Sequence, residues 1–180
     1  GDLLALLGIG PLLTARRRLG ARMTLRLLEE TERMAIESAE GQALELGWRR
    51  DNVRGITESQ YLSMVLQKTC WLGMIHPARV GAILGTRDSV PLEGFVRFGF
   101  FLGAAFQVQD DLLNLTGDAT AYGKELGGDI YEGKRSLMLI HLLARCDDDE
   151  RARLYAMLGT ARAERTPEDV AFARAALDRY

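Results

Sequence analysis

Apolar residues recur every three or four positions along almost the whole chain, and no segment shows the alternation of a β-strand. This spacing places apolar side chains on one face of successive α-helices. The pattern therefore predicts an all-α bundle with short connections and a single long loop. The expected helices cover residues 2–14, 20–46, 58–75, a segment ending near 84, about 89–116, 135–145, 148–159 and a last one from 167.

Two of these helices begin with recognisable capping signals. Thr57 followed by Gln60 resembles a capping box, in which each side chain bonds the backbone N–H of the other residue. Thr166 is expected to cap the last helix, with Pro167 at the first helical position and Asp169 three residues after the cap.

Two other features interrupt the helical pattern. His76-Pro77 is expected to break the helix that begins at 58, because proline lacks the backbone N–H that a helix interior uses. Residues 117–134, with the sequence GDATAYGKELGGDIYEGK, are rich in glycine and are expected to form the long loop.

Composition and charge narrow the possible functions. A chain of 180 residues suffices for one domain with a sizeable core. The 23 Lys and Arg against 25 Asp and Glu give a net charge of -2 and no electrostatic reason to expect a nucleic-acid partner. Cys70 and Cys146 form no CxxC motif and are expected to be free thiols of a cytoplasmic protein. The longest apolar stretch, residues 3–14, is too short to span a membrane and contains Pro11.

Two adjacent carboxylates, Asp110 and Asp111, lie in a helix that otherwise has the pattern of a buried apolar one. Burying a carboxylate is costly unless its charge is compensated. No Lys or Arg lies three or four residues away on this helix. A salt bridge to another helix is one solution. Because the amide of Asn114 lies one turn further on, the pattern favours a second solution, oxygen ligands for a hard cation such as Mg²⁺.

The glycine-rich loop supplies Lys124, Asp129 and Lys134. Mg²⁺ held by few carboxylates keeps water ligands and shares the phosphates of a substrate. Lysines on a glycine-rich loop are suited to bind such a diphosphate. The alternative is an ordinary surface loop, where glycine and lysine are common. The neighbouring aspartate pair favours the binding site.

A third polar feature is Lys68, at the centre of an apolar face of the 58–75 helix, with Thr69 beside it. A lysine in this position must extend to solvent, find a partner or face a polar cavity. The residues alone leave a solvated lysine and a ligand-binding lysine as equal alternatives.

The motifs together resemble a known family. FFLGAAFQVQDDLLNLTGD, followed by YGKELGGDIYEGKRS, resembles the second aspartate-rich region of the trans-isoprenyl diphosphate synthases, or polyprenyl synthetases. EGQALEL resembles the GQ motif of that family, YLSMVLQKTCWL its K-T helix, and GDLLALL the helix after its first aspartate-rich region. The resemblance covers nearly the whole chain and weakens after about residue 150.

The resemblance implies an all-α isoprenoid-synthase fold around a central cavity, with residues 1–180 as the C-terminal portion of a single domain. It implies an enzyme that condenses isopentenyl diphosphate with an allylic diphosphate, such as dimethylallyl, geranyl or farnesyl diphosphate, to a longer all-trans prenyl diphosphate. Mg²⁺ would assist departure of the allylic diphosphate, the double bond of isopentenyl diphosphate would attack the resulting carbocation, and a proton would then be lost to the released diphosphate. A cytoplasmic homodimer is also implied.

Roles for individual residues also follow from the resemblance. Asp110 would bind Mg²⁺ directly and take part in catalysis. Asp111 and Asn114 would bind the metal with it or support it. Thr69 and Gln107 would stabilise the cation or orient the ligands.

Further residues would bind the substrates. Lys68, Lys124 and Lys134 would hold the allylic diphosphate, with Lys68 also counted as catalytic. Gln42 and Asp129 would lie on the cavity wall as secondary contacts.

The sequence departs from the family pattern in ways that bear on function. The second motif reads DDLLN instead of DDxxD, so Asn114 offers an oxygen but no charge, and Glu45 stands where the family often has aspartate. The first aspartate-rich motif and the isopentenyl diphosphate site would precede the region where this sequence begins, so the chain alone is expected to be inactive. A non-catalytic partner subunit of a complete synthase and a class I terpene cyclase remain alternatives, although the retained lysines and the K-T and GQ motifs favour the synthase.

Overall fold

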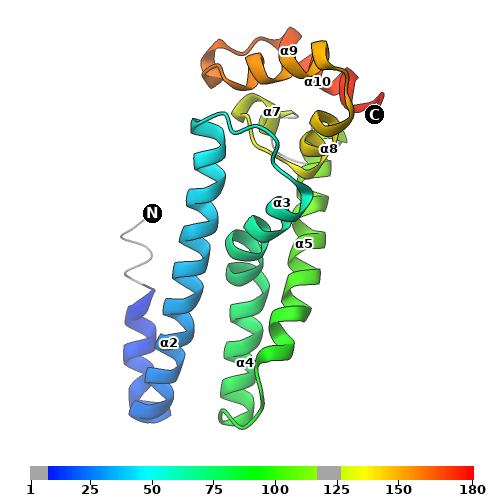
Figure 1. The fold of residues 1–180 in the computed structure, drawn as a ribbon. Helices are drawn as coiled ribbons and strands as arrows, with labels where there is room; N and C mark the ends of the chain where they lie inside the picture. The colour runs from blue at the N-terminus through cyan, green and yellow to red at the C-terminus, as the bar shows by residue number, and fades with distance from the viewer. Residues whose placement is uncertain (1–7, 117–126) are drawn as a thin grey trace.

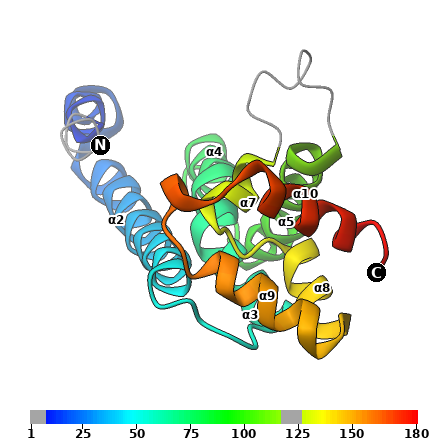
Figure 2. The same cartoon turned by 90° about the horizontal axis from the view of Figure 1, so that it is seen from above.

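A computed structural model describes residues 8–116 and 127–180, and these form helices with no β-strand. The expected all-α fold is confirmed. Figure 1 shows long helical rods running alongside one another, with the shorter C-terminal helices gathered over one end, and Figure 2 shows these from above. The rods are α2 (Ile9–Arg50), the continuous run of α3 (Glu58–Val65), η1 (Leu66–Ile75) and α4 (His76–Thr86), and α5 (Glu93–Thr116). The shorter elements are α7 (Gly128–Glu132), α8 (Leu137–Arg145), α9 (Asp148–Leu158), the 3₁₀ turn η2 (Arg162–Glu164) and α10 (Pro167–Leu177).

The sequence predicts two helices here, 2–14 and 20–46, and α2 does consist of two helical segments, which join at Gly20. Gly20 has a φ of 79° and a ψ of 165°, outside the helical region. Glycine adopts this conformation without the steric cost of a side chain, so the chain turns sharply there, and Figure 1 shows the short N-terminal segment lying alongside the long one. In the described part of the chain, no helix is long and apolar enough to cross a membrane.

The second rod begins at the predicted capping box. Thr57 Oγ1 accepts a hydrogen bond from Gln60 N at 3.2 Å, and Gln60 Oε1 accepts one from Thr57 N at 2.8 Å. The predicted interruption at His76-Pro77 is wrong, because α4 follows the preceding helix without a break. Pro77 lies at the junction of η1 and α4, where the His76 N–H still bonds to Trp71 O with the wider spacing of the π-helix, so the regular α-helical ladder that proline would disrupt has not yet begun.

The middle of this rod, η1, is a π-helix of ten residues that packs closely against the rods on both sides. A Cβ atom on Gly103 of α5 would lie 2.6 Å from Cys70 Sγ, and one on Gly99 would lie 2.5 Å from Ile75 Cγ1. On the opposite side, a Cβ on Gly41 of α2 would collide with the backbone of Lys68. These glycines let the backbones approach, and they place Lys68 and Thr69 between α2 and α5.

The last helices follow the sequence prediction closely. The starts and ends of α8 and α9 lie within two residues of the expected ranges. The helix α10 starts at Pro167 and is capped by Thr166, as predicted, and the Asp169 side chain completes a capping box. Their apolar faces form a core that includes Leu139, Leu142, Leu154, Leu158 and Ala173.

The predicted loop 117–134 contains a helix that the sequence analysis missed. This helix, α7, has five residues and is flanked by Gly127 with φ 72° and Gly133 with φ 68°. Both glycines adopt left-handed conformations that other residues rarely take. They turn the chain into and out of α7, which brings Asp129 and Lys134 back towards α5. Residues 117–126 of the same segment lie outside the described part.

Candidate active site

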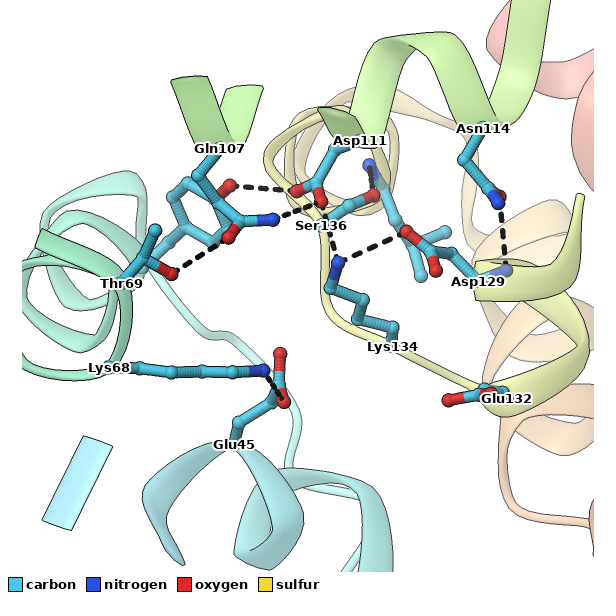
Figure 3. Close-up of polar contacts among 12 residues, drawn as sticks. Glu45, Lys68, Thr69, Gln107, Asp111, Asn114, Asp129, Glu132, Lys134 and Ser136 are labelled. Carbon is cyan, nitrogen blue, oxygen red and sulfur yellow. Dashed lines mark hydrogen bonds and ion pairs between the residues drawn. The ribbon is translucent and has the colours of Figure 1, made fainter. Parts of the chain in front are cut away.

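Asp111 lies at the centre of a buried polar network, shown in Figure 3. Its side chain is 0% exposed. The Tyr61 hydroxyl donates to Asp111 Oδ2 at 2.7 Å, while Gln107 Nε2 donates to Oδ1 at 2.8 Å. Lys134 Nζ donates to the same Oδ1 at 2.6 Å. Donors from α3, α5 and the turn after α7 therefore hold one carboxylate.

This network corrects one expectation about the aspartate pair. The residue pattern favoured a metal ion over a salt bridge to another helix as compensation for these charges. At Asp111 a side chain does compensate the charge, because Lys134 forms a salt bridge with it. Lys134 lies in the turn after α7 and not on another helix. Whether Asp111 also binds a metal stays a prediction.

Lys134 is held between two carboxylates. Its ammonium lies 2.6 Å from Asp111 Oδ1 and 3.1 Å from Asp129 Oδ2, and its side chain is 14% exposed. Burial alone would lower the pKa of Lys134, but Asp111 and then Asp129 raise it above its ordinary value. Lys134 is therefore a permanent cation at the edge of the network, as a diphosphate-binding residue must be.

Asn114 links α5 to the start of α7. Its side-chain Oδ1 accepts a hydrogen bond from Asp129 N at 3.0 Å, and its backbone oxygen accepts one from Gly127 N at 2.8 Å. The side chain is buried. Asn114 thus satisfies backbone N–H groups at the start of α7 and fixes Asp129 beside the lysine. In these contacts the side-chain oxygen of Asn114 stabilises the start of α7. The predicted role of Asn114 as a metal ligand is not tested by them.

Thr69 and Gln107 connect the π-helix to the network. Thr69 Oγ1 donates to Gln107 Oε1 at 2.8 Å, and Gln107 in turn donates to Asp111. The amide of Gln107 is therefore fixed at both its oxygen and its nitrogen. Two residues that the sequence analysis assigned to the same site do lie in direct contact.

Lys68 reaches this region from η1 and pairs with α2. Its ammonium forms a short hydrogen bond with Glu45 Oε2, and Gln42 Nε2 lies 3.5 Å from the same oxygen (Figure 3). Glu45 is buried, and in the described chain its other oxygen, Oε1, has no hydrogen-bond partner. The predicted site residues Lys68 and Gln42 therefore meet at Glu45, which the sequence analysis noted only as a departure from the family pattern.

Asp110 lies beside Asp111 on α5 and is half-buried. Burial raises the pKa of Asp129, and the charges of Asp111 and Asp110 raise it further against the opposing effect of Lys134. Asp110 therefore contributes to the negative potential of the site. Lys124 lies outside the described residues, so its role stays a prediction.

The carboxylates fit a cation that shares its ligands with a phosphate group. Within residues 8–116 and 127–180, no three His, Cys, Asp or Glu side chains form a group that could hold a metal ion. Mg²⁺ in proteins is commonly bound by one or two carboxylates together with waters and substrate phosphates. Because the charges of Asp111 and Asp110 act unfavourably on the Asp129 carboxylate, a cation brought in with a diphosphate would relieve that repulsion.

Two members of the network were not assigned to the site from the sequence. Tyr61 occurs on the same predicted helix face as Lys68, but the apolar neighbours on that face made it look like an ordinary core residue. Glu45 belongs to the segment EGQALEL, where its spacing of three from Gln42 was the available signal.

The fold and this cluster define an all-helical protein with a buried lysine–aspartate site where helices of three rods meet. The chain belongs to the polyprenyl synthetase family, whose model matches residues 6–177. The short chain isoprenyl diphosphate synthase of Methanothermobacter thermautotrophicus is 34% identical over 125 residues, which make up 69% of this chain and 38% of that protein. The geranylgeranyl diphosphate synthase of Sulfolobus acidocaldarius is 32% identical over 165 residues, 92% of this chain and 49% of that protein.

A solved structure of a related protein has the same arrangement of helices. The geranylgeranyl pyrophosphate synthase of Corynebacterium glutamicum, complexed with isoprenyl diphosphate and magnesium, superposes with a TM-score of 0.76 at 26% identity. The match covers 89% of this chain and 44% of that structure. The chain thus spans about half the length, or less, of the relatives that it matches.

Proposed function

We propose that this chain contributes the allylic diphosphate site of a prenyltransferase. The reaction joins isopentenyl diphosphate to an allylic diphosphate, such as dimethylallyl, geranyl or farnesyl diphosphate, and gives a longer all-trans prenyl diphosphate. The observation that carries the proposal is Lys134, a buried cation between Asp129 and Asp111, the second aspartate of the sequence-predicted metal motif. The names of the curated relatives support the same class of reaction.

The lysines of the site would bind the diphosphate. Lys134 and Lys68 approach the polar network from different elements, and each is already paired with a carboxylate. Their remaining N–H groups would donate to diphosphate oxygens. Mg²⁺, held by Asp110 together with the diphosphate, would supply positive charge that makes the diphosphate a better leaving group.

Thr69 and Gln107 would act on the allylic end of the substrate. Their side chains are fixed by mutual hydrogen bonding and by Asp111, so their oxygen dipoles have a defined direction. Dipoles that are already oriented stabilise a developing positive charge without the cost of reorganisation. The two residues would thereby favour the allylic cation over the ground state.

An apolar stripe on α5 leads to the site. Phe98, Leu102 and Phe106 follow one another at intervals of four residues, and Asp110 is the next position in the series. The three apolar residues are 59%, 47% and 59% exposed, respectively. A row of exposed large apolar side chains marks a binding surface. A stripe that ends at a carboxylate suits a ligand with a hydrocarbon chain and a diphosphate head.

The decisive experiment separates binding from turnover. Titration calorimetry of the 180-residue chain with inorganic diphosphate and Mg²⁺ is expected to show binding, and Asp110→Asn is expected to weaken it by 10-fold or more, on the order of the loss seen when a metal contact is removed. Asp149→Asn makes the same chemical change at an exposed position of α9 and is expected to leave binding unchanged.

Turnover is then measured with Mg²⁺, isopentenyl diphosphate and geranyl diphosphate, with prenyl products identified by mass spectrometry. Diphosphate binding that survives Asp110→Asn, or no binding at all, would contradict the proposed site. Binding without condensation, in this chain and in any longer protein that contains it, would favour a non-catalytic partner subunit. The homodimer and the cytoplasmic location stay predictions from the family resemblance.

A further inference from the structure

Tyr61 is a buried tyrosine whose hydroxyl points at the candidate site. It lies on α3, is 0% exposed, and donates to Asp111 Oδ2 at 2.7 Å. Burial raises the pKa of Tyr61 far above its ordinary value, and the charge of Asp111 raises it further. At physiological pH the hydroxyl is therefore always protonated and always a donor.

The position of that hydroxyl is fixed by the fold. Tyr61 N bonds to Thr57 O at 3.0 Å in the first turn of α3, directly after the capping box. The tyrosine ring belongs to the core cluster that also contains Trp48, Met64, Val65, Cys70, Trp71, Ile75 and Ile140. A ring packed on all sides at the density of a protein interior has little freedom to move. Its hydroxyl is thus a fixed point next to the site.

Asp111 transmits this fixed position to two functional side chains. While Tyr61 holds Oδ2, the other oxygen, Oδ1, accepts hydrogen bonds from Gln107 at 2.8 Å and Lys134 at 2.6 Å. If Oδ2 had no donor, the carboxylate could turn about its Cβ–Cγ bond, and both partners would lose a stationary acceptor. Lys134 has three N–H groups, and two are directed at Asp111 and Asp129, so these carboxylates set the direction of the third.

We propose that Tyr61 is a positioning residue: its hydroxyl fixes the Asp111 carboxylate, which in turn orients Lys134 and Gln107 towards a bound diphosphate. The proposal rests on the proposed function only for the identity of that ligand. In this arrangement Asp111 acts chiefly as a support, and direct metal binding falls to Asp110.

The first test measures the network without any ligand. In a ¹H–¹⁵N spectrum of the ligand-free chain, Tyr61→Phe is expected to shift or broaden the side-chain amide signal of Gln107. Tyr155→Phe is the matched control, because Tyr155 is also buried and its hydroxyl accepts a hydrogen bond from Gly55 N at 3.0 Å outside the network. A Gln107 signal that is unchanged in Tyr61→Phe, or moved equally in Tyr155→Phe, would overturn the positioning role.

The second test measures the consequence for binding. Tyr61→Phe is expected to weaken the binding of inorganic diphosphate with Mg²⁺ by about 10-fold, the lower end of the range for residues that orient a binding group from behind. Tyr155→Phe is expected to bind within twofold of wild type. Both variants are measured at a temperature at which circular dichroism shows them folded, so that loss of the hydroxyl and loss of the fold are separated.

A double-mutant cycle tests whether Tyr61 acts through Asp111. Asp111→Asn is expected to weaken binding, and adding Tyr61→Phe to it is expected to cause no further loss. Equal and independent losses in the two variants would overturn the proposal. If wild type itself fails to bind diphosphate, the proposed function fails, and the diphosphate role of Tyr61 fails with it. If wild type binds diphosphate but the Tyr61 variants do not behave as expected, only the proposed role of Tyr61 is contradicted.

Discussion

Asp129 combines a favourable contact with an unfavourable environment. It lies 3.1 Å from Lys134, yet its pKa is raised, because burial and the charges of Asp111 and Asp110 outweigh the lysine. When the pKa of a carboxylate is higher in the folded than in the unfolded protein, ionisation of that carboxylate lowers the stability of the fold. Groups held in such unfavourable states are concentrated at functional sites, where binding of a cation can reverse the imbalance.

Asp129→Asn is therefore expected to stabilise the protein at pH 7, by on the order of 1 kcal/mol, the usual scale of single substitutions. The same change is expected to weaken the binding of diphosphate with Mg²⁺, because it removes a carboxylate from the site. Wild type regains the difference as the pH falls through the folded pKa of Asp129, since the side chain then becomes neutral like the amide. Below about pH 4, near the unfolded pKa, the two proteins are expected to be equally stable.

Urea denaturation between pH 4 and pH 8 measures this difference in the free energy of unfolding. Asp149→Asn, at an exposed position of α9, is the control for a change in net charge. A variant at Asp129 that is less stable than wild type at pH 7 would show that the salt bridge to Lys134 outweighs the repulsion.

The sequence predicted which residues gather at this site better than it predicted how they interact. Gln107, Asp111 and Lys134 were all assigned to it, and all three are in contact. The salt bridge was not predicted, because Lys134 is 23 residues from Asp111 in a segment expected to be a loop. Helical periodicity reports contacts three or four residues apart and says nothing about a partner that a turn brings back.

At the scale of elements, the π-helix η1 depends on small residues in its neighbours. Its turns carry Lys68 and Thr69, and Gly103 of α5 lies directly against Cys70. Because a Cβ atom there would lie 2.6 Å from a sulfur atom and 3.0 Å from a backbone carbon, the helices would have to separate. Their separation would lengthen the hydrogen bond between Thr69 and Gln107.

Gly103→Ala is therefore expected to lower the free energy of unfolding by about 1–3 kcal/mol, the cost of overpacking a core. It is also expected to weaken diphosphate binding. Gly81→Ala in α4 is the matched control, since a Cβ there meets no atom within 4 Å and alanine favours a helix by roughly 0.5–1 kcal/mol. Chemical denaturation of both variants measures the two effects, and equal stabilities would contradict the close packing of η1 on α5.

The positions of the long helices followed from apolar periodicity and capping signals, while their internal geometry did not. A π-helix keeps the same apolar composition as an α-helix, so the sequence of η1 gives no separate signal. The helix α7 was missed for another reason, since five residues between two glycines are too short to show a period. The break at His76-Pro77 was wrongly predicted because the proline lies where the π-helix passes into α4, and the sequence gives no sign of that change in hydrogen-bond spacing.

At the scale of the whole molecule, a charged site and an apolar stripe adjoin on one helix. The polar network is the proposed site for a diphosphate, and Phe98, Leu102 and Phe106 present hydrocarbon surface on the same helix. A ligand that uses both surfaces should bind more tightly than one that uses the polar site alone. The two surfaces can therefore be tested separately.

Geranyl thiolodiphosphate, an unreactive allylic analogue, is expected to bind with Mg²⁺ more tightly than inorganic diphosphate. Phe106→Ala is expected to weaken binding of the analogue by roughly 10-fold, the effect of losing one large apolar contact. It is expected to leave the binding of inorganic diphosphate unchanged. Leu25→Ala is the control, because Leu25 is 59% exposed, the same as Phe106, but lies on α2. Titration calorimetry provides the affinities, and an equal effect on both ligands would contradict the role of the stripe.

The contacts of Asp111 also have a consequence for the order of folding. Its partners lie 50, 4 and 23 residues away along the chain, at Tyr61, Gln107 and Lys134, respectively. Local helix formation can bring only Gln107 into place, whereas the other two contacts require the closure of long loops. The complete network can therefore form only after α3, α5 and the turn following α7 have docked. The network belongs to the finished native state, and its loss in the wild-type protein would report that one of these elements has undocked.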